Sequence, residues 1–213
     1  VLIGWSKDGF HWNRENKKPF LPVSEDFHAW NAGNVQSTAG SPLIVGDSLY
    51  FYVSGRYNSK PKHDSNFATG LAMLRRDGFV SMRAGRKEGY IEGKTQIPAN
   101  GNYLFVNADV KGTLAVEVLD DNGQPMEGFT KKDCISMKKS DKTKQMISWE
   151  KHPGVTSLVG KTVRLKFYLN QADIYAFWIS AWQTGESGGY TGGGGPGLSD
   201  EGIDTPMDKL KNN

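Results

Sequence analysis

Four side chains near the start of the sequence have the chemistry that recognises a sugar. Trp30, Asn34, Gln36 and Arg56 combine one large aromatic ring with amide and guanidinium groups. A sugar ring presents flat C–H faces that stack on aromatic rings, and its hydroxyls exchange hydrogen bonds with such polar groups. These residues are the predicted substrate-binding set. The structural alternative is that Trp30 belongs to the core and Asn34 to a turn.

The acidic residues do not suggest a catalytic pair. Asp8 and Asp47 each stand next to a glycine, where an aspartate caps its own turn. Glu25 and Asp26 are adjacent, so in a strand their side chains would point to opposite faces. Hydrolysis of a glycosidic bond needs two suitably spaced carboxyl groups. No catalytic residue is therefore predicted.

Histidine and cysteine give little support for a metal centre or a nucleophile. Asp64 adjoins His63, but an exposed loop pair explains the two more simply than an acid–base unit. His28 and His63 match no common ligand spacing. Cys134 is predicted to be a small buried hydrophobe. The glycines at 192–195 lack the Lys-Ser/Thr of a phosphate-binding loop. No metal and no cofactor are predicted.

The elements that must position these groups are short strands. Glycines and aromatic residues are abundant, and Asp-Gly or Asn-Gly turns separate segments of alternating polarity. The predicted strands include residues 48–54, 67–74, 103–110, 113–119, 162–169 and 174–178. Hairpin turns are predicted at 121–123 and at 170–173. The pattern predicts an all-β protein with a partial domain at residues 1–80, a sandwich at 81–182 and a flexible glycine-rich tail at 183–213.

The charge is mildly basic, with a formal net charge of +3, and part of it is concentrated in lysines of residues 131–144. A solvated loop is the simplest interpretation of this cluster, and a patch for an acidic glycan or nucleic acid is the alternative. No nucleic-acid-binding motif accompanies it. No segment approaches the roughly 18 apolar residues that cross a bilayer. Neither nucleic acid nor membrane is a predicted partner.

Three blocks of sequence resemble the last blades of the five-bladed β-propeller glycoside hydrolases of families 32, 43 and 68. Residues 6–12 read SKDGFHW, which is similar to the S-x-D-G-x-x-W hairpin of those blades. Residues 46–56, GDSLYFYVSGR, follow Trp30 and residues 33–37. Residues 70–81, GLAMLRRDGFVS, resemble the strand that leaves the propeller, and residues 104–110, LFVNADV, resemble the appended sandwich.

The resemblance implies the last blades of a partial β-propeller followed by a jelly-roll-like antiparallel β-sandwich. It also implies the C-terminal part of a glycoside hydrolase-like protein that binds or braces a glycan site. The alternatives are a stand-alone, non-catalytic carbohydrate-binding module and an assembly subunit. The family's early acidic motifs, W-x-N-D-P-N, R-D-P and E-C, do not occur in this chain. Whether the chain is an enzyme therefore stays open.

The resemblance also sets the expected partners. An oligo- or polysaccharide is the expected ligand, and the expected protein partner is the missing N-terminal propeller or a second copy of the chain. An incomplete propeller has unpaired strand edges, which favour association. We therefore predict that the chain dimerises through residues 1–75 or aggregates. The resemblance slightly favours a secreted or extracytoplasmic protein, while the residues themselves fix no compartment.

Overall fold

The computed structural model describes residues 1–6, 8–38, 42–57, 67–189 and 202–206, and the protein is all-β. It forms two compact units, Val1–Met73 and Leu74–Asn213, which are described separately here. The division falls between Met73 and Leu74, a few residues before the predicted end of the first domain at residue 80. Within the described residues, no helix is long and apolar enough to cross a membrane.

The first unit opens with a small hairpin formed by β1 (Trp5–Ser6) and β2 (Trp12–Asn13). Asp8 closes its turn, because its Oδ1 accepts hydrogen bonds from the backbone N–H groups of Phe10 at 2.9 Å and His11 at 2.8 Å. Gly9 follows with φ of 79°, a conformation that glycine adopts without strain. The capping role predicted for Asp8 is confirmed.

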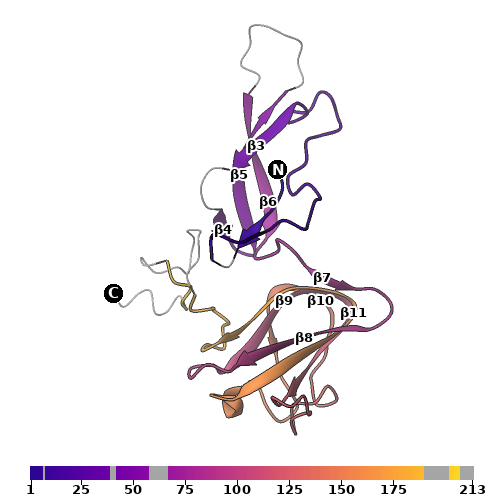
Figure 1. Cartoon of the computed structure of the whole chain (residues 1–213), viewed down its shortest axis with the longest axis vertical. Helices are drawn as coiled ribbons and strands as arrows, with labels where there is room; N and C mark the ends of the chain where they lie inside the picture. Colours follow the sequence, from indigo (N-terminus) through magenta and orange to yellow (C-terminus); the bar gives the residue numbers. More distant parts are fainter. Residues whose placement is uncertain (7, 39–41, 58–66, 190–201, 207–213) are drawn as a thin grey trace. The chain divides into compact units, whose positions relative to one another are not determined.

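The main sheet of the first unit is antiparallel and centres on β5 (Ser48–Arg56). Strands β3 (Asn34–Thr38) and β4 (Leu43–Val45) pair with successive parts of β5, and β6 (Phe67–Arg75) also pairs with it (Figure 1). Burial alternates strictly along β5, as a strand with two different faces requires. This alternation is the signal by which the sequence predicted the strand.

Both faces of this sheet carry apolar side chains. One face, here called the inner face, is buried and consists of Val35, Ile44, Leu49, Phe51 and Val53. The opposite or outer face carries exposed hydrophobic residues, namely Leu43, Val45, Tyr52, Phe67, Leu71 and Met73. An antiparallel sheet with one solvated face normally alternates apolar and polar residues. The outer face departs from that pattern.

The second unit is one five-stranded antiparallel sheet that curls into a half-barrel (Figure 1). Its strands are β7 (Met82–Ala84), β8 (Gly89–Gln96), β9 (Tyr103–Leu119), β10 (Met137–Ile147) and β11 (Thr162–Ser180). One edge of β11 pairs with β9, while its other edge pairs with β8 and then β7. A short 3-10 helix, Thr156–Leu158, precedes β11.

Strands β9 and β11 are each longer than predicted, and the hairpin turn predicted at residues 170–173 is wrong. Residues 170–173 do not form a hairpin turn; they continue β11 through a bulge in which Gln171 has φ of 43°. The pairing continues past this point, because Ala172 pairs with both Val110 of β9 and Ala84 of β7. The extra residue of the bulge lies on β9, where Lys111 and Gly112 together face Gln171. Bulges of this kind increase the local twist and help the sheet to curl.

The curled sheet encloses a hydrophobic core. Leu114, Val116 and Leu165 are fully buried, and Phe167 and Trp149 are 1% exposed. The indole N–H of Trp149 donates to the backbone carbonyl of Val116 at 3.0 Å, so its burial leaves no unpaired donor. The core therefore holds β9 and β11 rigidly from one face.

Two surface segments differ from their predicted character. Residues 137–144, which belong to the lysine-rich segment interpreted as a solvated loop, lie in the edge strand β10 (Met137–Ile147), where exposed lysines discourage edge-to-edge pairing. Part of the predicted glycine-rich tail is fixed to the second unit: the indole of Trp178 donates to the carbonyl of Gly185 at 3.0 Å, and Asp204 accepts from the backbone of Ser187 at 2.7 Å. Residues 190–201 and 207–213 of that segment lie outside the described residues.

Candidate functional site

Trp30 lies against the backbone of the first unit's sheet. A Cβ atom built on Gly55 or on Gly70 would come closer than 3.0 Å to the six-membered ring of the Trp30 indole. Gly55 occupies the same face of β5 as Val53 and Phe51, because residues at every second position of a strand share a face, so the indole lies on the inner face. The two glycines thus form a slot in which one part of the ring is covered by β5 and β6. The remainder of Trp30 is only half-buried.

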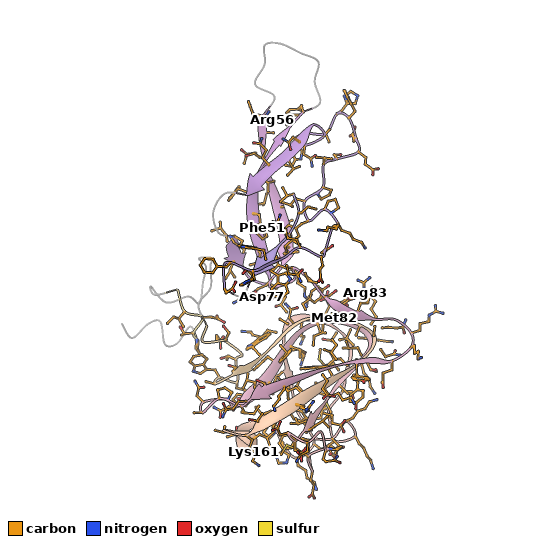
Figure 2. The ribbon with its side chains drawn as sticks, in the orientation of Figure 1. Phe51, Arg56, Asp77, Met82, Arg83 and Lys161 are labelled. Carbon is orange, nitrogen blue, oxygen red and sulfur yellow. The ribbon has the colours of Figure 1, made fainter. Side chains whose placement is uncertain are left out.

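Asn34 and Arg56 meet on the other face of the same sheet. They are register partners across β3 and β5, and directly opposite residues in an antiparallel pair share a face. The Arg56 guanidinium carbon lies 4.6 Å from the ring centroid of Phe67, near one end of β5 (Figure 2). Gln36 is exposed on β3, next to an irregularity in the pairing. The structure therefore brings Asn34 and Arg56 together and places Trp30 on the opposite face.

The exposed acid–base pair of the first unit is Asp8 with His11, whose Nδ1 lies 2.5 Å from Asp8 Oδ2. The pKa of Asp8 is held well below its usual value, first by the hydrogen bond from the His11 backbone N–H and then by the His11 side chain. A carboxylate held in its charged form at a solvent-exposed turn is a poor proton donor. The pair His63 and Asp64 lies outside the described residues.

Cys134 is buried in the second unit. Its Sγ accepts a hydrogen bond from the backbone N–H of Val116 at 3.2 Å. Burial raises the pKa of the thiol, and the hydrogen bond from Val116 only partly opposes that rise. A neutral, enclosed thiol is unreactive. The prediction that Cys134 is a buried hydrophobe is confirmed.

A surface of the second unit combines aromatic rings with paired charges. Tyr90 on β8 and Tyr168 on β11 are register partners, and their ring centroids are 6.4 Å apart. In the next row across the sheet, Lys166 is opposite Glu92 of β8 and Glu117 of β9. We call these five residues, together with Lys131, the tyrosine face. It is the side of the sheet opposite the core, because Leu165 and Phe167 alternate with its members on β11.

Fixed contacts organise the tyrosine face. The Tyr168 hydroxyl donates to Glu117 Oε2 at 2.7 Å, and Lys131 Nζ donates to Glu88 Oε1 at 2.6 Å. The ammonium nitrogens of Lys166 and Lys131 lie 4.3 Å from the ring centroids of Tyr90 and Tyr168, respectively. Partial burial and then the hydrogen bond to Glu117 raise the pKa of Tyr168 to about 12. The phenol therefore stays neutral and stays a donor at any physiological pH.

A row of three carboxylates crosses the opposite end of the second unit's sheet. Asp109 on β9 is the register partner of Asp141 on β10 and of Asp173 on β11. Arg75 forms an ion pair with Asp141, and Arg83 donates to Asp173 Oδ1 at 2.8 Å. The two arginines thus pair with two of the three carboxylates. Throughout the part of the chain that the structure describes, no group of three or more His, Cys, Asp or Glu residues is placed to hold a metal ion.

A hollow of about 390 Å³ also opens on the second unit. Its lining residues are Tyr103, His152, Pro153, Gly154, Thr156 and Ser157. The His152 ring stacks on Phe129 with a centroid separation of 4.3 Å, so packing holds the imidazole in place. No acidic side chain lines the hollow, and it offers no acid–base pair for catalysis.

No protein-family model, curated protein or solved structure matches this chain. The resemblance to propeller glycoside hydrolases therefore stays a prediction.

The tyrosine face was not predicted from the sequence, although the sequence contains a signal for it. Every second position of β8 carries a polar or aromatic residue, namely Tyr90, Glu92 and Lys94. The same is true of β11 at Arg164, Lys166 and Tyr168. Each pattern predicts a polar, aromatic-bearing side of a strand. Only the register between the two strands, which sequence does not give, shows that the tyrosines are neighbours.

Proposed function

We propose that this chain is the C-terminal part of a glycoside hydrolase-like, carbohydrate-active protein in which it binds or braces a glycan site. In this proposal the first unit contributes the last blades of a propeller, each blade being one antiparallel sheet of the ring. The second unit, whose single sheet is curled, takes the place of the appended sandwich in this proposal. The observation that carries the proposal is the presence of apolar residues on both faces of the first unit's sheet.

A blade needs two apolar faces because each sheet in a propeller packs between two others. The outer face of the first unit carries Phe67 at 61% exposure and Met73 at 67%, together with four further exposed hydrophobic residues. Monomeric proteins rarely leave a contiguous apolar patch of more than a few hundred Å² open. Another sheet of the same kind, from a preceding blade or from a second copy, would cover this face.

The glycan site of the proposal is built on the end of β5. Arg56 supplies guanidinium donors, and Asn34 supplies an amide on the same face. Gln36 on β3 is exposed nearby in sequence, and Trp30 supports the sheet from the inner face. Donors of this kind satisfy sugar hydroxyls without any demand for a charged ligand. The site as described binds; it contains no assigned catalytic acid.

Retention of the chain in native gels that contain soluble polysaccharides tests this function. We expect the wild-type chain to be slowed by at least one neutral polysaccharide and Arg56→Ala to lose most of that retardation. Arg14→Ala is the matched control, because Arg14 is an exposed arginine of the same unit. Equal mobility of the wild-type chain in all gels, with and without polysaccharide, would contradict the proposal.

The second candidate is a stand-alone, non-catalytic carbohydrate-binding module. The observation that favours it is the exposed Tyr90, at 63%, on the rigid second unit. Hydrolysis of a glycan panel separates the two candidates at the level of the whole protein. The module predicts retention without release of sugars, whereas the hydrolase-like protein releases sugars once its remaining blades are present.

A further inference from the structure

We propose that the tyrosine face of the second unit is a separate binding surface for a neutral polysaccharide chain. The proposal rests on the proposed carbohydrate function only for the class of ligand. Its residues, Tyr90, Tyr168, Lys166, Glu92, Glu117 and Lys131, all differ from those of the first unit's site.

The rings of the tyrosine face are held in place before any ligand arrives. Tyr90 and Tyr168 lie on paired strands whose other side belongs to the core, so their Cα positions are fixed by β8 and β11. The Tyr168 hydroxyl is held by Glu117 at 2.7 Å. Preorganised groups lose less conformational entropy on binding than groups on a loop. The site is therefore built on strands, as a stacking platform requires.

The ring faces are covered by groups that a sugar can replace. Lys166 Nζ lies 4.3 Å from the centroid of Tyr90 and 5.4 Å from that of Tyr168. Exposed ammonium–aromatic contacts are weak, and the lysine stem is flexible. A sugar C–H face can take the place of the ammonium over Tyr90. The displaced ammonium then donates hydrogen bonds to the hydroxyls at the rim of the sugar.

The charges of this surface balance, which selects a neutral ligand. The cations of this part of the sheet are Lys94, Lys131, Arg164 and Lys166, and the anions are Glu88, Glu92, Glu117 and Asp121. The ion pairs among them are Lys131 with Glu88, Arg164 with Glu92 at 3.2 Å, and Lys94 with Asp121. A polyanion would meet as much repulsion as attraction here. Hydroxyl groups, by contrast, find donors and acceptors in equal supply.

Affinity electrophoresis of the full chain tests this surface in gels of neutral polysaccharides, with a polyuronate gel in parallel. The neutral probes are soluble fructan, arabinan, xylan and mixed-linkage glucan. We expect Tyr90→Ala to weaken retention in the gel that retains the wild-type chain by about tenfold, because a stacking ring is lost. Tyr90→Phe keeps the ring and should keep retention. Ile135→Ala is the matched control, since Ile135 is 59% exposed on the same unit.

The outcomes separate this proposal from the proposed function. If Tyr90→Ala matches the wild-type chain while Arg56→Ala loses retention, the tyrosine face is wrong and the first unit's site stands. Stronger retention in polyuronate than in every neutral gel would overturn the neutral ligand class. If no gel retains the wild-type chain, both proposals fall. Unchanged thermal unfolding of Tyr90→Ala shows that any loss of retention is not a loss of fold.

Discussion

Replacing Gly55 by alanine tests whether Trp30 is a packed residue or a free stacking platform. The new Cβ would lie within 3.0 Å of two ring carbons of the Trp30 indole and 3.1 Å from the Cβ of Asn31. Ordinary van der Waals contacts of a Cβ begin at 3.4 Å, and the closest ring carbon would lie at 2.3 Å, so the indole must move by about 1 Å or leave its slot. Gly70, the other wall of the slot, prevents a simple retreat along the sheet.

Two effects of opposite sign decide the free energy of unfolding. Removing a strand glycine restricts the unfolded chain and stabilises by about 0.4–1 kcal/mol where the native backbone accepts alanine. Forcing an extra carbon into a packed site costs about 1–3 kcal/mol. The clash is the larger effect, so Gly55→Ala should destabilise the first unit by about 1–2 kcal/mol. In a unit of this size a loss of that magnitude is expected to lower the Tm by roughly 4–16 °C.

Urea unfolding followed by tryptophan fluorescence and by far-UV circular dichroism measures this effect. Gly93→Ala is the control: Gly93 also lies inside a strand, β8, but a Cβ built there meets nothing within 4 Å. We expect it to be neutral or slightly stabilising. On a Trp30→Leu background, Gly55→Ala should cost much less, because the ring that it meets is gone. Equal urea midpoints for the wild-type chain and Gly55→Ala would show that the Trp30 ring is not packed against Gly55. Trp30 would then be free to stack on a sugar.

Three further outcomes are expected. Burial raises the pKa of Asp173, but the hydrogen bonds from Arg83 and Ser81 outweigh that effect and lower it. The stability that the charged Asp173 carboxylate contributes is present above the unfolded pKa of about 3.9 and is lost as the pH falls through the lower folded pKa. The urea midpoint of Asp173→Asn should therefore change less between pH 7 and pH 3 than that of the wild-type chain, and parallel pH profiles would contradict this. Cys134 should react with iodoacetamide at pH 8 only after urea unfolding, and rapid labelling of the folded chain would contradict its burial. The wild-type chain should self-associate in light scattering and Leu71→Lys should reduce the association, since Leu71 is 46% exposed on the outer face; a monodisperse wild-type monomer would contradict this.

The sequence predicted strands best where one face alone is buried. Residues 48–54 were predicted as a strand from the alternation of Leu49, Phe51 and Val53 with Tyr50 and Tyr52, and β5 runs from Ser48 to Arg56. The prediction failed at residues 170–173, where the polar run around Gln171 resembles a turn. Pairing on both edges of β11 holds that run in the sheet, and such pairing depends on residues distant in sequence.

The candidate sites show a similar division. The types of Trp30, Asn34, Gln36 and Arg56 favour sugar binding, but residue type does not give the face of the sheet on which each one lies. The register of β3 with β5 places Asn34 beside Arg56, and the slot at Gly55 places Trp30 on the other face. Both facts are tertiary, so they required the structure.

The central position of β11 has a consequence for the order of folding. Strand β8 has its partner in β11, which follows β9 and β10 in the chain. While the polypeptide is being synthesised, β8 and one edge of β9 therefore remain unpaired until β11 has left the ribosome. Pairings between segments so distant in sequence form slowly and expose unpaired strands to aggregation. The second unit should thus complete its fold only after translation has passed Ser180, and nascent chains truncated before that point should depend on chaperones to stay in solution.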